Sequence, residues 1–389
     1  MNLDVEYAEY RNYIEEFAKT IDPHDQLPLR VSGYCLRDYE IHGEIIQWLI
    51  VYLGRACPTT LRIYLIKTAL KRILEKVYDA PEECGYDGSR DIYQPLKLVK
   101  VVVAVVNNII FDLQDNAKLY EVPLPPTSEN ASELTKLRQP PKVSVDAIKN
   151  SRRTMEDRHV ILEDFNGYFD IIQDSEPTFY YGIFDGHSGS DAATYANSHL
   201  NYNISVHPSY PSDIKKAISA AFLVTDIEFL KKAQAENLSS GTTALCAIYR
   251  KTQKKLFVGW CGDSQALIAR LGNVHQIVKK HSPEDACERK RIEDLGGIVL
   301  YWSNSYRVNG QLAVSRAIGD ISHKPFVTAE PDIVELDLDG EEDFFVMACD
   351  GLWDSLTEDD VALTVYKKLK EDPSEYFFII IFLTTTSIN

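Results

Sequence analysis

Four short segments of the chain combine carboxylates with glycine, histidine or arginine, which are residue types that bind metals and move protons. They are RRTMEDRH (152–159), IFDGHSG (183–189), WCGDSQ (260–265) and ACDGLWD (348–354). In the last three, an Asp stands at or just beyond the end of an apolar stretch typical of a β-strand. Taken singly, such a corner is more often a plain turn, because Asp and Gly both favour tight turns.

Taken together, the corners predict a metal site. If their strands lie side by side, Asp185, Asp263 and Asp350 meet at one rim, where burying unpaired carboxylates is costly. A divalent cation offsets that cost, and hard oxygen ligands select Mg²⁺ or Mn²⁺. Gly186 and Gly351 allow the backbone to turn tightly and a carbonyl to approach the cation. A carboxylate shared by two ions would give a two-metal hydrolytic site, in which bridging water becomes hydroxide near neutral pH.

Two further residues have side chains suited to phosphate chemistry. Arg152 lies four residues before Glu156, so its guanidinium can stand near the acids and bind a phosphate through a bidentate fork. His187 lies two residues after Asp185, where an imidazole can donate a proton to a leaving oxygen near neutral pH. Each has a plainer alternative, a surface basic pair for Arg152 and a structural histidine for His187.

The elements that must position these residues follow from periodicity. Residues 61–77 have apolar side chains at helical spacing, and 96–113 are predicted to be helical because their length outweighs the strand preference of their valines. Strands are predicted in FYYGIFDGH, GTTALCAIY, KLFVGWCGDS, QALIARLGN and DFFVMACDG, and helices in 190–200, 213–236 and 285–295. This alternation alone indicates a mixed α/β or α+β protein.

Composition narrows the class of protein. The chain has 389 residues and a formal net charge of −17, which argues against nucleic acid or an anionic membrane as the main partner. Its seven cysteines form no C-x-x-C pair, which predicts reduced thiols in the cytoplasm or nucleus and gives no zinc signature. The amino terminus lacks a secretory apolar segment, and the apolar runs VVVAVV and FFIIIFL are shorter than a membrane helix requires. We therefore expect no membrane span.

The motifs and their order resemble the metal-dependent protein phosphatases of the PP2C (PPM) family, over about residues 145–360. The resemblance also includes GTTA (241–244), RVNGQLAVSRAIGD (307–320) and KPFVTAEPD (324–332). ERKRIEDLGGIV (288–299) and the long helical amino-terminal region resemble the branch of the calmodulin-dependent kinase phosphatases and the nematode sex-determination phosphatase.

The resemblance implies an α+β fold, a central β-sandwich of two antiparallel sheets flanked by helices. We expect a helical domain at 1–120, a Pro-rich linker at 121–143 and a phosphatase domain at 144–389. The implied activity is Mg²⁺- or Mn²⁺-dependent hydrolysis of phosphoserine and phosphothreonine in protein substrates, by attack of water that bridges the metals. The implied location is cytoplasmic, with the nucleus as a second compartment, and residues 1–120 are expected to bind a protein partner.

The resemblance also implies a role for each candidate residue. It implies that Asp185 bridges two metal ions and that the Gly186 carbonyl is a further ligand. Asp350 would bind the first ion and Glu156 the second. Asp263 and Asp354 would contribute to a third, weaker ion site. For the substrate it implies Asp157 holding metal-bound water, Arg152 binding the phosphate and His187 protonating the leaving oxygen. The run SRAIGD around Arg316 is interpreted as a packed scaffold turn.

The carboxyl-terminal end departs from the family pattern. Family members have a late Asp-Asn pair that supplies a ligand of the first metal, followed by a valine-rich strand. Only 35 residues follow Asp354 here, and no acid among them precedes an Asn. A truncated or alternatively spliced product is the favoured explanation, and a catalytically weak scaffold or adaptor is the alternative function. FFIIIFL (377–383) is expected to fill a strand position or to aggregate.

Overall fold

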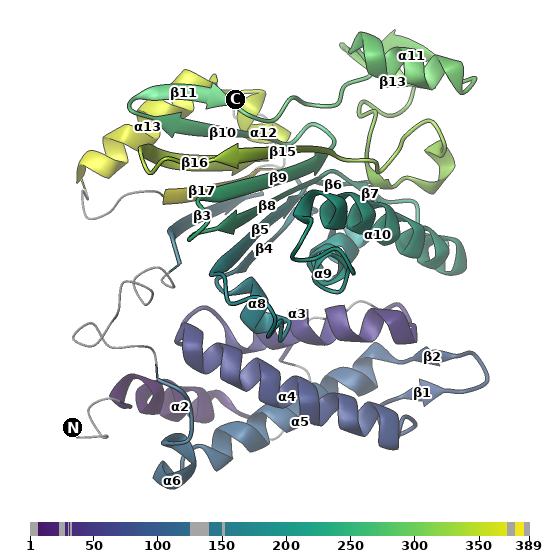
Figure 1. The fold of residues 1–389 in the computed structure, drawn as a ribbon. Coiled ribbons are helices and arrows are strands. Elements are labelled where there is room, and N and C mark those ends of the chain that lie inside the picture. Colours follow the sequence, from purple (N-terminus) through teal and green to yellow (C-terminus); the bar gives the residue numbers. More distant parts are fainter. Residues whose placement is uncertain are drawn as a thin grey trace. The chain divides into compact units, whose positions relative to one another are not determined.

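The computed structural model describes residues 7–22, 28–29, 31, 33–124, 140–149, 152–371 and 378–384 (Figure 1). Most of the predicted Pro-rich linker, residues 125–139, lies outside the described residues. The chain divides into two compact units. The first takes in the described residues before position 136 together with Asn166–Gln173, and the second takes in the rest. No helix of the described residues is long and apolar enough to cross a membrane.

The first unit is mainly helical. Its helices are α2 (Ala8–Thr20), α3 (Ile41–Leu53), α4 (Thr59–Asp79), α5 (Pro95–Asp112) and α6 (Asn116–Leu119), with a 3-10 turn η1 (Asp38–Glu40) and a hairpin of β1 (Tyr86–Asp87) and β2 (Ile92–Tyr93). The helices predicted at 61–77 and 96–113 are confirmed as α4 and α5. Pro95 in the first turn of α5 has a φ suited to a helix start, and the 18-residue length exceeds that of ordinary strands.

The second unit contains two five-stranded sheets. One has the order β15-β9-β8-β5-β4, with bounds Asp332–Asp337, Lys255–Cys261, Ala244–Arg250, Thr178–Phe184 and Arg158–Leu162. The other has the order β11-β10-β16-β17-β3, with bounds Asn273–Gln276, Gln265–Arg270, Glu342–Ala348, Phe378–Thr384 and Lys142–Ile148. All five predicted strand segments are confirmed.

Smaller elements complete the second unit. Two short sheets are formed by β6 (Gly186–His187), β7 (Gly241–Thr242) and β14 (Ile318–Gly319), and by β12 (Val299–Trp302) and β13 (Ser305–Val308). The helices are α9 (Asp191–Ser205), α10 (Ile214–Glu236), α11 (Ala286–Asp294), α12 (Asp350–Trp353) and α13 (Glu358–Glu371), with a 3-10 turn η2 (Ile321–His323). A four-residue helix, α8 (Phe165–Tyr168), begins in this unit and ends in the first.

The main core lies between the two large sheets. Side chains alternate along β16, so that Phe345 and Met347 join a buried cluster with Tyr181 and Leu245 of the facing sheet. The intervening Phe344 packs on the other side, in a cluster with residues of α12 and α13. Burying each such side chain contributes about 1.5–3 kcal/mol. The predicted sandwich is confirmed, with α9 and α10 covering one sheet and α12 and α13 covering the other (Figure 1).

A glycine sets the distance between α10 and its sheet. A Cβ added to Gly259 of β9 would lie 2.6 Å from Cγ2 of Ile218 on α10. The helix therefore approaches the strand more closely than any side chain at that position would allow.

Strand β17 differs from the expected pattern, because it pairs in parallel with both β16 and β3. The strand predicted in FFIIIFL is confirmed for residues 378–383 and continues to Thr384, but it makes this sheet mixed rather than purely antiparallel. After β16, helices α12 and α13 lie between the two strands in sequence. A helical crossover of this kind brings the chain back to the start of the sheet, so the next strand runs in the same direction.

Candidate metal centre

Strand register brings the predicted acids to one end of the sandwich. In the first sheet, Arg158 at the start of β4 is opposite Phe184 at the end of β5. Asp157, which precedes Arg158, and Asp185, which follows Phe184, therefore lie at the same end. The next pairs continue this arrangement, since the start of β8 is opposite the end of β9, the strand that leads to Asp263.

The second sheet supplies the remaining acid. Gln265 at the start of β10 is opposite Ala348 at the end of β16, which places Asp263 and Asp350 beside one another. The GTTA segment holds the Asp185 corner, because the backbone N–H of Thr243 donates to the Asp185 carbonyl at 2.9 Å. The Asp185 N–H donates in turn to the Thr243 hydroxyl at 3.3 Å.

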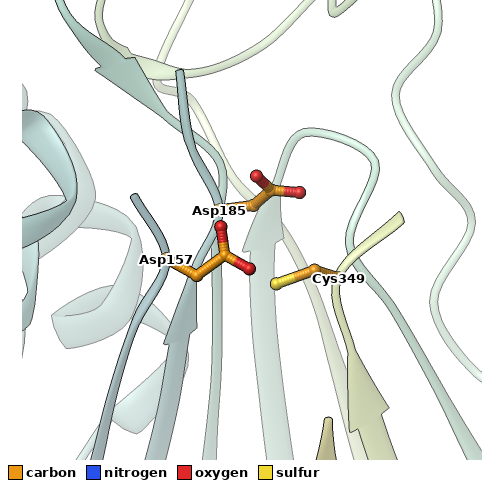
Figure 2. A group of neighbouring side chains, drawn as sticks. All are labelled: Asp157, Asp185 and Cys349. Carbon is orange, nitrogen blue, oxygen red and sulfur yellow. The ribbon is translucent and has the colours of Figure 1, made fainter. Parts of the chain in front are cut away.

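Two overlapping groups of metal-binding side chains result. In each group, the ligand atoms all lie within 4.8 Å of one another. One group consists of Asp185, Asp263 and Asp350, and the other of Asp157, Asp185 and Cys349 (Figure 2). Asp185 belongs to both groups, which is the position expected for a bridging ligand.

The carboxylates are poorly neutralised by the protein itself. Burial raises the pKa of Asp157 to about 6 and that of Asp263 to about 7, with Asp350 adding to both shifts. The pKa of Asp185 is raised well above its usual range, first by burial and then by the charges of its acidic neighbours. Oδ2 of Asp157 is buried and has no hydrogen-bond partner in the described chain. Four crowded acids with an unpaired oxygen fit a divalent cation.

Burial also raises the pKa of Asp350. Two predicted residues outside the two acidic groups, Arg152 and Asp354, also shift this pKa through their charges. The charge of Arg152 lowers the pKa of Asp157 and Asp350, so its guanidinium is close enough to act on these acids, and its side chain is exposed. The charge of Asp354 raises the pKa of Asp350, and Asp354 is exposed. Arg152 is thus available to a solvent-borne anion.

Glu156 and Gly186 come together through their backbones. A Cβ added to Gly186 would lie 2.5 Å from the Glu156 carbonyl oxygen, so only glycine fits this position. The Glu156 carboxylate accepts a hydrogen bond from the Thr154 hydroxyl at 3.2 Å. It belongs to neither of the two acidic groups found among the described residues.

His187 has a partner that the sequence analysis missed. Its Nε2 lies 2.9 and 2.8 Å from the two carboxylate oxygens of Asp320, which is 2% exposed. Burial lowers the pKa of His187, but the hydrogen bond and the charge of Asp320 outweigh it, so the pKa is raised overall. Asp320 follows β14, which pairs with β7, and β7 pairs with β6, the strand of His187.

Asp320 ends the SRAIGD run, for which the sequence indicates only a scaffold turn. Arg316 fits that interpretation, since it binds Glu288 at 2.7 Å and Asp332 at 3.0 Å. The overlooked signal was one more Gly-Asp corner in the chain. Cys349 was also missed, because an isolated cysteine without a regular spacing gave no metal signature. Burial raises the pKa of its thiol well above the usual range.

Comparison with known proteins identifies the family. The family model described as protein phosphatase 2C matches residues 142–378. Human protein phosphatase 1F is 36% identical over 362 residues, which cover 92% of this chain and 78% of the relative. Human protein phosphatase 1E is 36% identical over 363 residues, covering 90% of this chain, and the chain spans only 45% of that relative's length. The chain belongs to the protein phosphatase 2C family, as its motifs predicted.

Solved structures agree on the fold. A C. elegans sex determining protein has a TM-score of 0.68 at 21% identity, covering 96% of this chain and 86% of its own. A serine-threonine phosphatase 2C from Toxoplasma gondii has a TM-score of 0.53 at 18% identity, covering 60% of this chain and 87% of its own. The similarity in fold to the nematode protein takes in residues of both compact units.

Proposed function

We propose that this protein is a Mg²⁺- or Mn²⁺-dependent phosphatase that hydrolyses phosphoserine and phosphothreonine in protein substrates. The observation that carries the proposal is the position of Asp185 in two overlapping groups of acidic side chains at one end of the sandwich. Family membership supports the same activity, because the protein phosphatase 2C family is metal-dependent.

Two ions are proposed, with Asp185 between them. Asp350 would bind the first ion, and Glu156 and the Gly186 carbonyl the second, with Asp263 and Asp354 available to a third, weaker ion. Every proposed ligand atom in this set is an oxygen, which suits Mg²⁺ and Mn²⁺. When bound, such ions polarise phosphoryl oxygens and lower the pKa of water.

The other residues would act on the substrate and on protons. Arg152 is exposed and its charge reaches the acids, so it is proposed to bind the phosphate through its guanidinium fork. Asp157 is proposed to orient water through its carboxylate. His187 is proposed to protonate the leaving serine or threonine oxygen. Because Asp320 engages Nε2, Nδ1 is proposed as the ring nitrogen that donates this proton.

Release of phosphate from a phosphothreonine peptide, with and without Mn²⁺, tests this proposal. We expect Mn²⁺-dependent turnover in the unchanged chain and a loss of at least roughly 100-fold in Asp185→Asn, beyond the 10–100-fold typical of outer-shell residues. Asp146→Asn is a matched control, because Asp146 is an exposed carboxylate on β3. Absence of Mn²⁺-dependent turnover in the unchanged protein would refute the proposal.

A catalytically weak scaffold or adaptor is the second candidate. It is favoured by one observation, that no carboxylate after Asp354 joins either acidic group in the part of the chain the structure describes. We propose that residues 1–120 form a helical domain that binds a protein partner, that 121–143 are a linker and that 144–389 form the phosphatase domain. A cytoplasmic or nuclear location is proposed, in keeping with seven free cysteines. A chain with no Mn²⁺-dependent turnover that still captures a partner would favour this candidate.

A further inference from the structure

Cys349 is a buried thiol inside the acidic centre. It follows the end of β16 and has no exposed surface. Its Sγ lies within 4.8 Å of carboxylate oxygens of Asp157 and Asp185. Figure 2 shows the thiol and the Asp157 carboxylate pointing toward one another, from the ends of two different sheets. The hydrolytic function proposed above gives this thiol no task.

The Asp157 carboxylate gives independent evidence that a cation binds here. Its side chain is 4% exposed, and although the carboxylate interacts with the Cys349 thiol and with Asp185, Oδ2 is left without a hydrogen-bond partner among the described residues. A buried carboxylate oxygen in that condition is costly unless a proton or a cation reaches it. Figure 2 shows Sγ of Cys349 on the side toward which the Asp157 carboxylate points.

We propose that Cys349, Asp157 and Asp185 form a mixed sulfur and oxygen site for a thiophilic divalent cation of the zinc class. Thiolate ligands select such cations, whereas Mg²⁺ and Mn²⁺ prefer oxygen. Three protein ligands leave the fourth tetrahedral position to water. Binding breaks the S–H bond and forms a metal–sulfur bond, the proton passes to solvent, and no atom changes oxidation state.

The distances allow this site after a small adjustment. Zinc–sulfur bonds are about 2.3 Å and zinc–oxygen bonds about 2.0–2.2 Å, so ligand atoms around a tetrahedral zinc lie roughly 3.3–3.7 Å apart. The atoms here lie within 4.8 Å, so the side chains must close in by up to about 1 Å around the ion. The second acidic group contains no sulfur, so the two ends of the centre differ in the metals they favour.

Competition follows from the shared residue. Asp185 belongs to both groups, so a thiophilic cation bound to it takes up one of the two positions that the proposed hard ions share on this carboxylate. The effect on turnover rests on the proposed phosphatase function, but capture of the cation does not. Zinc-class cations are therefore expected to inhibit, and excess Mn²⁺ to relieve the inhibition.

A cobalt titration of the full chain tests capture without any activity assay. Co²⁺ replaces zinc in such sites, and a cobalt–thiolate bond gives an intense charge-transfer absorption in the near ultraviolet. We expect this band in the unchanged protein and in Cys287→Ser, since Cys287 is exposed and lies in neither group. We expect its loss in Cys349→Ser and Cys349→Ala. Absence of the band in the unchanged protein, or its persistence in either Cys349 variant, overturns the proposal.

An inhibition assay tests the consequence. Each variant is normalised to its own Mn²⁺-dependent turnover, and the Zn²⁺ concentration that halves it is measured. We expect Cys349→Ala to need at least roughly tenfold more Zn²⁺, because even the loss of a residue that only supports a metal ligand typically costs about 10–100-fold in affinity. Equal sensitivity to Zn²⁺ contradicts the proposal. If the unchanged chain shows no turnover, the phosphatase function fails while the cobalt band still decides the site.

Discussion

Replacing Asp157 by Asn should stabilise the metal-free protein at alkaline pH, although it damages the metal centre. In the absence of a cation, burial raises the pKa of Asp157 from 3.8 to about 6, only partly offset by hydrogen bonds from Cys349 and Asp185. At 1.36 kcal/mol per pKa unit, the ionised form costs the fold about 3 kcal/mol at pH 8. Coupling to Asp185 makes this figure an upper limit, since protonating either acid relieves the other.

The sign of the pH dependence follows from linkage. A carboxyl whose pKa is higher in the folded state contributes stability below its unfolded pKa, and that stability is lost as pH rises through the folded value near 6. The neutral amide of the Asp157→Asn variant carries no such cost. The advantage of this variant should therefore be largest at pH 8 and about half as large at pH 5.

Thermal unfolding in EDTA measures the effect. For a domain of this size, about 3 kcal/mol corresponds to an increase in Tm of roughly 6–12 °C at most. Asp146→Asn, an exposed change on β3, should stay within about 0.5 kcal/mol of the unchanged protein. With saturating Mn²⁺ the order should reverse, because the unchanged protein gains more from the cation. An Asp157→Asn protein that is no more stable than the unchanged chain at pH 8 in EDTA would refute the electrostatic account of the centre.

Three further predictions concern the same centre. Burial raises the pKa of Asp263 to about 7, so Mn²⁺ binding should release protons and weaken as pH falls through 7; calorimetry in two buffers of different ionisation enthalpy checks this, and equal heats would contradict it. Asp320→Asn should lower kcat by about 10–100-fold and move the alkaline limb of the pH–kcat profile to lower pH, because His187 loses the carboxylate that raises its pKa. A profile at the same pH as that of the unchanged protein would exclude a positioning role for Asp320. Gly186→Ala should destabilise the fold by about 1–3 kcal/mol and reduce Mn²⁺ affinity, since the new Cβ meets the Glu156 carbonyl oxygen at 2.5 Å; an unchanged Tm and affinity would show that the corner adjusts freely.

Much of the fold could be predicted, because its signals are local. Apolar runs that end in Asp-Gly or Gly-Asp mark strand ends, and strands paired in register deliver those ends to one rim. That pattern predicts that Asp185, Asp263 and Asp350 lie together, and the geometry confirms their proximity. Helix α5 could be predicted from its length despite its valines.

Other features depend on contacts that no local pattern encodes. Asp320 reaches His187 across 133 residues of sequence, through the three-stranded sheet that joins β6, β7 and β14. The Cys349 thiol faces the acids only because of the direction in which β16 presents it. The parallel pairing of β17 arises from the crossover that precedes it, whereas the composition of the segment indicated only a strand.

Mn²⁺-dependent release of phosphate from a phosphothreonine peptide tests the central claim most directly, with the unchanged chain compared with Asp185→Asn. Asp185 joins both groups of candidate ligands, so the account predicts turnover that requires Mn²⁺ in the unchanged protein and falls by at least roughly 100-fold in the variant. Turnover that persists in Asp185→Asn, or that does not depend on Mn²⁺ in the unchanged chain, would contradict the account.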